Sequence, residues 1–347
     1  MQLKTRTSSS PSQDTLTAAP AAPITPASSL GPMAVRANRR RTVIPNWLKL
    51  LLSNRFALVG SIMLLIIVLA AIFAPLLTTY DPSGIASAQS SLSPTSGNWF
   101  GTNQQGEDIF SQVIYGGRLS LTIGAIVGVL GVSLAMIVGM LAGYIGGWID
   151  EALGVVMNIF LVIPQLPLLI VASAYLPVKG GLGMIIILSI TGWAWGGRVL
   201  RAQTLSLRNR DFVQAAYLSG EPTWRIVFFE IMPNMISLMV SSFIFTFIGA
   251  ILAEAGLEFL GFGDINTISW GTILYWAQTN SALLTGEWWH FLFPGLAIAL
   301  TITSLVFINY GIDAISNPRL RAIKVAKQYR NQVKARAAAT AAARVTS

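Results

Sequence analysis

Six long runs of apolar residues, separated by polar segments, dominate the pattern along the chain. They lie at about residues 56–77, 119–144, 153–176, 182–199, 235–257 and 291–312. Each run holds few or no charged residues and is close to the roughly 20 residues that an α-helix needs to cross a bilayer core. The pattern therefore predicts an all-α integral membrane protein with about six transmembrane helices. Glycines at 192, 196 and 197 interrupt the fourth run, so its end is the least well defined.

The composition agrees with a membrane protein. The chain has 347 residues, of which 53% are apolar and only 11% charged, about half the charged fraction of an ordinary soluble domain. Because cysteine is absent, disulfides, thiolate metal sites and cysteine nucleophiles are excluded. The single histidine, His290, argues against imidazole catalysis or a histidine metal site. We expect no catalytic residue, no metal and no cofactor bound by this chain.

The two ends of the chain differ from the part that holds the apolar runs. Residues 1–44 are rich in Ser, Thr, Pro and Ala and end in a basic cluster; with so little apolar area to bury, they are predicted to be a disordered tail. Residues 47–52 form a short amphipathic stretch that we expect along the membrane surface. Residues 45–318 make up the membrane domain. Residues 319–347 form a second basic tail, near anionic lipid or a partner.

The distribution of Lys and Arg predicts the orientation. All but Arg118 and Lys179 of the 23 basic residues lie before the first run, between the fourth and fifth runs, or after the sixth. Basic residues concentrate in cytoplasmic segments of membrane proteins, so these three segments and both termini are expected inside the cell. The net charge of +9 then reflects topology and contact with membrane lipid. It does not indicate nucleic-acid binding.

Two long connections are expected on the outer side, at residues 80–117 and 258–289. Both carry acidic residues, and the second has no Lys or Arg, so they could attract a cationic substrate or partner. The aromatic residues of the second connection are interpreted as anchors at the membrane interface, with docking as the alternative. The candidate docking residues of the two loops are Asp108, Asp264 and Trp270.

The connection between the fourth and fifth runs, about residues 200–234, is too polar to span a membrane and too regular for a linker. Val213, Ala216 and Tyr217 recur at helical spacing, Gly220 permits a sharp helix exit, and Pro222 can open a second helix. The pattern predicts two short helices with a break at Gly220. A short helix held at the membrane face by spans on both sides suits mechanical contact with a cytoplasmic partner.

This loop resembles the EAA signature of bacterial ABC-importer permeases. The similar residues are Gln214-Ala215-Ala216, Gly220 and Ile231-Met232-Pro233-Asn234. Over about residues 47–320, further motifs resemble the C-type subunit of the dipeptide, oligopeptide and nickel permease group. They include Trp99-Phe100-Gly101-Thr102-Asn103, Gly106-Glu107-Asp108-Ile109-Phe110-Ser111, Ala142-Gly143-Tyr144, Gly146-Gly147-Trp148-Ile149-Asp150, Ala253-Glu254-Ala255, Phe259-Leu260-Gly261, Ser269-Trp270-Gly271 and Phe293-Pro294-Gly295.

The resemblance implies a type I ABC-importer permease in a bacterial or archaeal cytoplasmic membrane. Its implied partners are a B-type permease subunit, two cytoplasmic ATPase subunits and an extracellular or periplasmic substrate-binding protein. Peptide is the substrate we favour; nickel chelates and glutathione-like compounds are alternatives. ATP and Mg²⁺ would be bound by the ATPase subunits, because this chain has no GxxxxGKS or GxxxxGKT phosphate loop. The loop would dock on one ATPase, with these coupling residues: Gln214, Ala215, Ala216, Tyr217, Gly220, Glu221, Trp224 and Pro233.

The chain departs from the family pattern at two positions. The family usually has Glu at the position of Gln214 and Arg at that of Glu107. The first carboxylate of the loop motif is therefore missing, and we expect no salt bridge from Gln214 of the kind that a glutamate could form. The helix, glycine, helix geometry does not depend on that carboxylate.

Polar and helix-breaking residues within the spans are candidates for the translocation path. Asn158 and Asn309 are polar groups of the kind that face protein or water instead of lipid. Pro164 and Pro167 should kink the third span and free backbone carbonyls, with helix packing as the alternative interpretation. Four glycines recur at a spacing that lets helices pack closely: Gly124, Gly128, Gly139 and Gly143.

Two other classes of protein remain as alternatives. Glu254 and Glu258 lie one helical turn apart near the outer end of the fifth run, on one face of the helix. Paired carboxylates serve acid–base chemistry, so one alternative is a multispan membrane enzyme, although no nucleophile, metal cage or oriented base accompanies the pair. A channel or carrier without ATP coupling is the other. A membrane enzyme does not account for the signature in the loop, and co-purification of ATPase subunits would argue against both classes.

Overall fold

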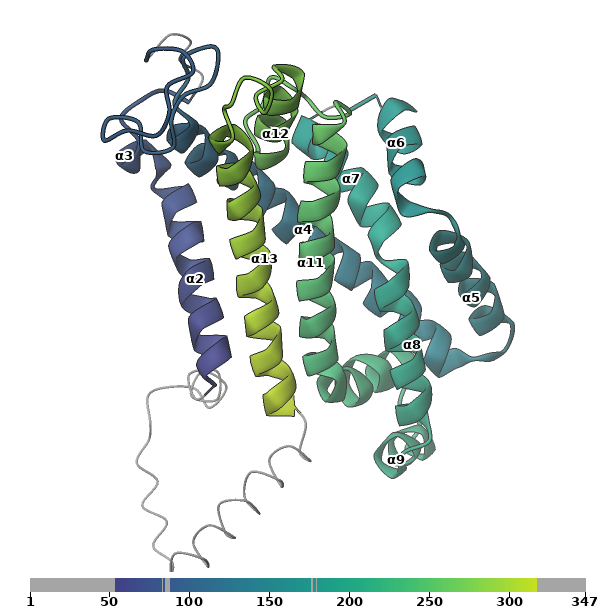
Figure 1. The fold of residues 1–347 in the computed structure, drawn as a ribbon. Coiled ribbons are helices and arrows are strands. Elements are labelled where there is room, and N and C mark those ends of the chain that lie inside the picture. The colour runs from purple at the N-terminus through teal and green to yellow at the C-terminus, as the bar shows by residue number, and fades with distance from the viewer. Residues whose placement is uncertain (1–53, 83, 85–87, 176, 179, 317–347) are drawn as a thin grey trace, which may run out of the picture. The chain divides into compact units, whose positions relative to one another are not determined.

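The computed structural model describes residues 54–82, 84, 88–175, 177–178 and 180–316 (Figure 1). These residues belong to one compact unit, Ile44–Ser347. The tail predicted at 1–44, the surface stretch at 47–52 and the tail at 319–347 lie outside the described residues. Within them, secondary structure consists of helices and one isolated bridge between Thr102 and Asp108.

The helices follow the predicted runs in order. They are α2 (Arg55–Ile72), α3 (Ala74–Leu77), α4 (Ile109–Ile145), α5 (Gly147–Val162), α6 (Gln165–Tyr175), α7 (Gly180–Gly192), α8 (Ala194–Arg208), α9 (Asp211–Leu218), α10 (Thr223–Arg225), the π-helix η1 (Ile226–Ile231), the 3₁₀-helix η2 (Met232–Met235), α11 (Ile236–Phe259), α12 (Trp270–Thr279) and α13 (Trp289–Ser316). α9 lies at one end of α8 and α11, and α12 lies at the other (Figure 1). We call these the α9 end and the α12 end.

Five helical segments of the described residues are long and apolar enough to cross a membrane. The third predicted span, 153–176, is present only as the pair α5 and α6, which is bent by 92°. The kink expected in this span is confirmed, and Pro164 is its cause. The residue before it, Ile163, has extended backbone angles (φ −68°, ψ 126°), as steric clash with a following proline demands. Pro167 lies in the first turn of α6, where its missing N–H breaks no helical hydrogen bond.

Two helices extend beyond the apolar runs that predicted them. α4 begins at Ile109, inside the predicted outer loop 80–117, because Asp108 caps it: the Asp108 carboxylate accepts a hydrogen bond from the Ser111 N–H at 2.8 Å. α8 continues to Arg208, inside the predicted loop 200–234. Hydropathy underestimates both helices, because their ends are polar while their backbone remains helical.

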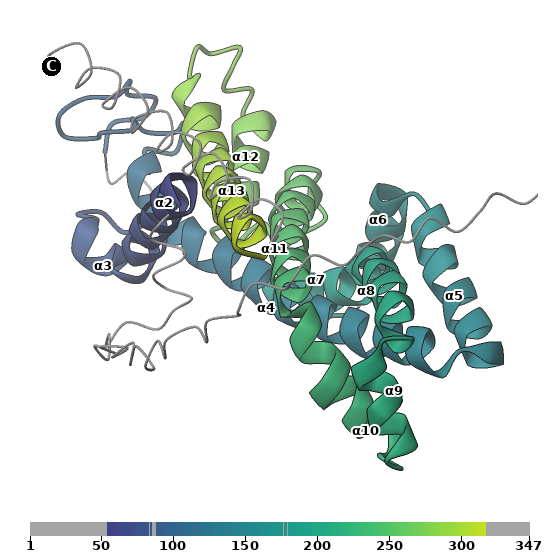
Figure 2. The ribbon, with the colours of Figure 1, turned by 90° about the horizontal axis from the view of Figure 1, so that it is seen from below.

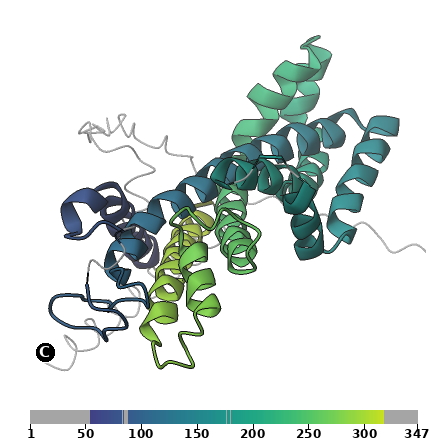
Figure 3. The same ribbon diagram turned by 90° about the horizontal axis from the view of Figure 1, so that it is seen from above.

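α4 is the helix around which the others pack. Its 37 residues make it roughly 55 Å long, and it contacts α2, α5, α7, α8, α11, α12 and α13. Figures 2 and 3, which view the helices from opposite ends, show α4 running diagonally across them. The predicted close packing at its glycines is confirmed. A Cβ at Gly124 would lie 2.3 Å from the Phe247 ring, and one at Gly139 would lie 2.3 Å from the Gly197 carbonyl.

Candidate functional site

The loop between α8 and α11 has the predicted helix, glycine, helix geometry. α9 ends at Leu218, and Gly220 follows with a positive φ of 78°, a conformation that favours glycine. The Gly220 N–H donates to the Tyr217 carbonyl at 3.0 Å, and the Glu221 N–H donates to the Ala216 carbonyl at 3.2 Å. These bonds close the last turn of α9. The chain then resumes helical structure at Thr223 and stays helical into α11.

Buried apolar side chains fix this loop to the spans. Val213, Ile226 and Ile231 are buried in one cluster with Met140 of α4 and Leu200 of α8. The same cluster includes Met157 of α5 and Met235 at the end of η2. α9 is therefore packed rigidly against the helices it follows.

An ion pair adds a polar tie at the same end. Arg201 of α8 pairs with Asp150 of α5 through two contacts, and its Nη2 lies 2.6 Å from Asp150 Oδ2. Two parallel contacts between a guanidinium and a carboxylate fix the relative orientation of the side chains. The pair thus links α8 to α5 close to the start of the loop.

In contrast to the buried side chains that anchor the loop, five of its large apolar side chains are exposed. Tyr217 is 64% exposed, Leu218 is 81% exposed and Trp224 is 59% exposed. The set, which we call the α9 surface, is Phe212, Tyr217, Leu218, Trp224 and Phe229. Figure 2 shows α9 and α10 standing out at this end of the helices. Exposed apolar patches rimmed by polar residues mark interaction sites on proteins.

The remaining residues expected to couple the loop to a partner lie beside this surface. Gln214, Ala215 and Pro233 are exposed, whereas Ala216 is half-buried. Glu221 is half-buried and pairs with Arg225 one turn further along the chain.

A pocket of about 450 Å³ lies next to α9 and is lined in part by Tyr144, Arg208, Gln214 and Thr223. The Gln214 amide donates a hydrogen bond to the Arg208 carbonyl at 3.2 Å. A glutamate at position 214 could not donate this bond, because a carboxylate only accepts.

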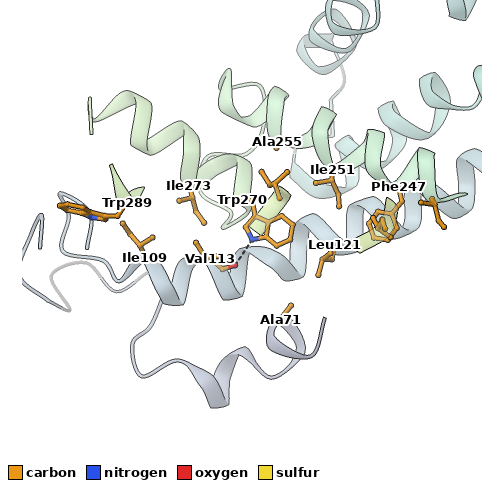
Figure 4. Close-up of a cluster of buried hydrophobic side chains, with 13 residues drawn as sticks. Ala71, Ile109, Val113, Leu121, Phe247, Ile251, Ala255, Trp270, Ile273 and Trp289 are labelled. Atoms are coloured by element: carbon orange, nitrogen blue, oxygen red, sulfur yellow. Dashed lines mark hydrogen bonds between the residues drawn. The ribbon is translucent and has the colours of Figure 1, made fainter. Parts of the chain in front are cut away.

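Of the three residues expected to dock a partner at the α12 end, two are buried. Asp108 accepts hydrogen bonds from Ser111 and from the Asn98 amide at 3.0 Å. The buried Trp270 donates its indole N–H to the Val113 carbonyl at 2.9 Å (Figure 4). Asp264 is partly exposed. Asp108 and Trp270 thus hold this end of the protein together, and the docking prediction rests on Asp264 alone.

The Glu254 and Glu258 carboxylates are both buried, at the point where α4, α11 and α12 meet. Ser120 of α4 donates to Glu254 at 3.0 Å, and the Ser269 hydroxyl at the start of α12 donates to Glu258. The sequence allows an acid–base site at this pair. Its hydrogen bonds instead tie three helices together, and burial keeps its oxygens from solvent. His290 is also buried, and its ring nitrogens have no hydrogen-bond partner among the described residues.

The residues expected on a translocation path occupy different environments. Asn158 of α5, Pro164 at the bend and Pro167 of α6 are exposed. Asn309 is buried, and its amide donates to Asp313 at 3.4 Å. Asn309 is therefore packed within this chain, and its place on a translocation path stays a prediction.

A second pocket, which was not predicted from the sequence, lies beside the bend between α5 and α6. It is lined in part by Gln165, Trp195 and Thr246. The available signal was Gln165, a polar residue set beside prolines in an otherwise apolar run.

Comparison with known proteins adds independent findings. Residues 135–322 match the family model for the binding-protein-dependent transport system inner membrane component, and residues 46–94 match the model for the N-terminal TM domain of oligopeptide transport permease C. The chain is 34% identical over 270 residues to the oligopeptide transport system permease protein OppC of Bacillus subtilis, covering 78% of this chain and 87% of that protein.

Two further relatives give similar values. The dipeptide transport system permease protein DppC of Bacillus subtilis is 33% identical over 271 residues, which cover 77% of this chain and 83% of that protein. The oligopeptide transport system permease protein OppC of Mycobacterium tuberculosis is 31% identical over 291 residues, which cover 83% of this chain and 97% of that protein. These alignments extend over most of both chains in each pair.

Proposed function

The chain belongs to the family of binding-protein-dependent transport system inner membrane components, and from this premise we propose that it is the C-type permease subunit of an ATP-driven peptide importer. The observation that carries the proposal is the exposed α9 surface, which is anchored by buried side chains to membrane-spanning helices. Peptide is the proposed substrate because the relatives are named as oligopeptide and dipeptide permease proteins.

In the proposed complex, the α9 end faces the cytoplasm and the α9 surface docks on one of two ATPase subunits. This orientation follows from the basic residues, since α8 and the loop after it carry five of them, Arg198, Arg201, Arg208, Arg210 and Arg225. The pocket of about 450 Å³ beside Gln214 would accept a side chain of the ATPase. ATP and Mg²⁺ are bound by the ATPases, so this chain has no catalytic role of its own.

In this proposal, coupling depends on the rigidity of the loop. A displacement of the α9 surface would be transmitted through Val213 and Ile226 to α4 and α8. The ion pair of Arg201 with Asp150 would transmit it further to α5. A well-packed interface transmits displacement because it is not continuously deformable. The other partners in this proposal are a B-type permease, which completes the pathway, and an extracellular or periplasmic binding protein, which delivers peptide at the α12 end.

The test is purification of the chain from its native membrane in mild detergent, followed by identification of the proteins that accompany it. Two ATPase subunits and a second permease are expected. ATP hydrolysis by this material should rise when peptide is supplied together with the extracellular binding protein. If the chain emerges alone or as a homodimer without an ATPase, the proposal fails and a carrier without ATP coupling replaces it.

A further inference from the structure

Two helix breaks meet at one pocket between the two ends of the protein. The pocket has a volume of about 360 Å³ and receives side chains from α4, α6, α7, α8 and α11. Gln165 is the first residue of α6, directly after the 92° bend, and Gly192 is the last residue of α7. The residues on which the argument depends are Gln165, Gly192, Trp195, Phe245, Thr246 and Gly249.

The chemistry of this pocket does not suit lipid. Gln165 is exposed and Thr246 partly exposed, and neither side chain forms a hydrogen bond with another described residue. In the hydrocarbon region of a bilayer, broken helices and polar side chains are tolerated where they are buried in protein or line a cavity that holds water. The pocket is therefore expected to be covered by protein or to hold water or substrate, and not to face lipid.

The walls of the pocket are aromatic and carry no charge. Trp195 and Phe245 are about half-exposed, and their rings meet edge to face at 6.1 Å between centroids. None of the residues that line the pocket is Asp, Glu, Lys or Arg. A charged group that entered would lose hydration without gaining a counter-ion, which is costly. The volume falls in the range of about 300–1,000 Å³ that pockets for small molecules occupy.

We propose that this pocket is a subsite of the translocation pathway that takes an uncharged, preferably aromatic, side chain of the transported peptide. The Gln165 amide and the Thr246 hydroxyl pair with the main chain of the peptide, and Trp195 and Phe245 pack against its side chain. This inference rests on the proposed function, because it assumes that peptide is the substrate. It goes beyond that function by assigning residues that select among peptides.

Two glycines make the pocket testable without disturbing the fold. A Cβ added at Gly192 or Gly249 would meet no atom within 4 Å. A larger side chain at Gly249 therefore extends into open space at the pocket. Gly295 provides a matched control, because a Cβ there is equally free of contacts and its helix, α13, does not line the pocket.

The experiment measures uptake of three peptides, Ala-Ala-Ala, Ala-Phe-Ala and Ala-Lys-Ala, by cells that express the whole transporter. Gly249→Leu should reduce uptake of Ala-Phe-Ala by at least about tenfold relative to Ala-Ala-Ala. Gly295→Leu should leave this ratio at its wild-type value. Gln165→Glu places a carboxylate in the neutral pocket and should raise uptake of Ala-Lys-Ala relative to Ala-Phe-Ala.

Other outcomes separate this inference from the proposed function. If the wild type imports the peptides and both pocket variants keep its selectivity, the subsite is wrong while the importer stands. If Gly249→Leu loses its second permease on purification, the pocket is a subunit interface and the subsite is again wrong. Equal loss of all three peptides in an intact complex would overturn the proposed selectivity. If the wild type imports none of the three, both the subsite and the proposed function fail.

Discussion

The two ends of this protein use the same residue types in opposite ways. At the α9 end, Tyr217 and Trp224 point their rings outward from an anchored loop. At the α12 end, Trp270 and the carboxylates of Asp108 and Glu258 are buried and hydrogen-bonded to neighbouring elements. An aromatic or acidic residue beyond the spans is therefore not a docking residue by type. Burial decides whether it stabilises the protein or presents a surface.

This difference predicts which substitutions alter stability and which alter binding. At the α12 end, loss of a large buried side chain such as Trp270 should affect folding first. At the α9 end, loss of an exposed side chain should leave the fold intact and weaken the proposed contact with an ATPase.

The largest effect is expected from Trp270→Ala. The indole is 1% exposed, packs against Gly117 and donates to the Val113 carbonyl, so its removal leaves a cavity and removes this hydrogen bond. The free energy of unfolding should fall by about 3–5 kcal/mol, measured as a lower melting temperature of the purified complex. Trp288→Ala is the control. Because Trp288 is 52% exposed, its removal should change the free energy of unfolding little. If both variants lowered the melting temperature equally, burial would not decide which tryptophan stabilises the protein.

Trp224→Ala should produce the next largest effect, on binding. Trp224 is 59% exposed and touches Phe229 edge to face, so its loss removes contact area without opening the core. Affinity for the ATPase should fall by about 2 kcal/mol, roughly 30-fold, in a pull-down with purified ATPase, while the melting temperature stays constant. Trp148→Ala removes a tryptophan at the start of α5 that is 77% exposed and should leave this affinity unchanged. If Trp224→Ala bound the ATPase as tightly as the wild type, the ATPase contact would have to lie outside the α9 surface.

Gly220→Ala should have a smaller and local effect. The backbone at Gly220 is left-handed, with φ of 78°, and an alanine in this conformation costs about 1–2 kcal/mol. The added Cβ itself would meet no neighbouring atom within 4 Å. The exit of α9 should shift, so that peptide uptake falls while the amount of protein in the membrane is unchanged. Gly154→Ala lies within α5, where alanine favours the helix, and should keep normal uptake. Normal uptake by Gly220→Ala would argue against coupling through this turn.

Gln214→Glu should have the smallest effect. It removes one exposed hydrogen bond to the Arg208 carbonyl, and substitutions of this kind change stability by less than about 0.5 kcal/mol. Stability and affinity for the ATPase should both stay close to wild type, as measured by melting temperature and pull-down. A large gain in affinity would instead show that a carboxylate at position 214, which the family usually has, contributes to the ATPase contact.

Sequence reasoning succeeded where a long periodic or apolar signal was present. The apolar runs located the spans, the spacing around Val213 located α9, and Gly220 located its end. It failed at boundaries, because a cap such as Asp108 extends α4 into polar sequence. It could not separate docking from structural roles for Trp270, whose hydrogen-bond acceptor, the Val113 carbonyl, lies far away along the chain.

The sequence by itself determined that this chain is a helical membrane protein with a patterned loop, since hydrophobic length and turn chemistry are local properties. Tertiary structure alone decided which residues meet. It brought Gln165, Trp195 and Thr246 from three helices to one pocket. The physical reason is that burial and cavities arise from packing between distant segments, and no local pattern specifies how much of a side chain a distant helix will cover.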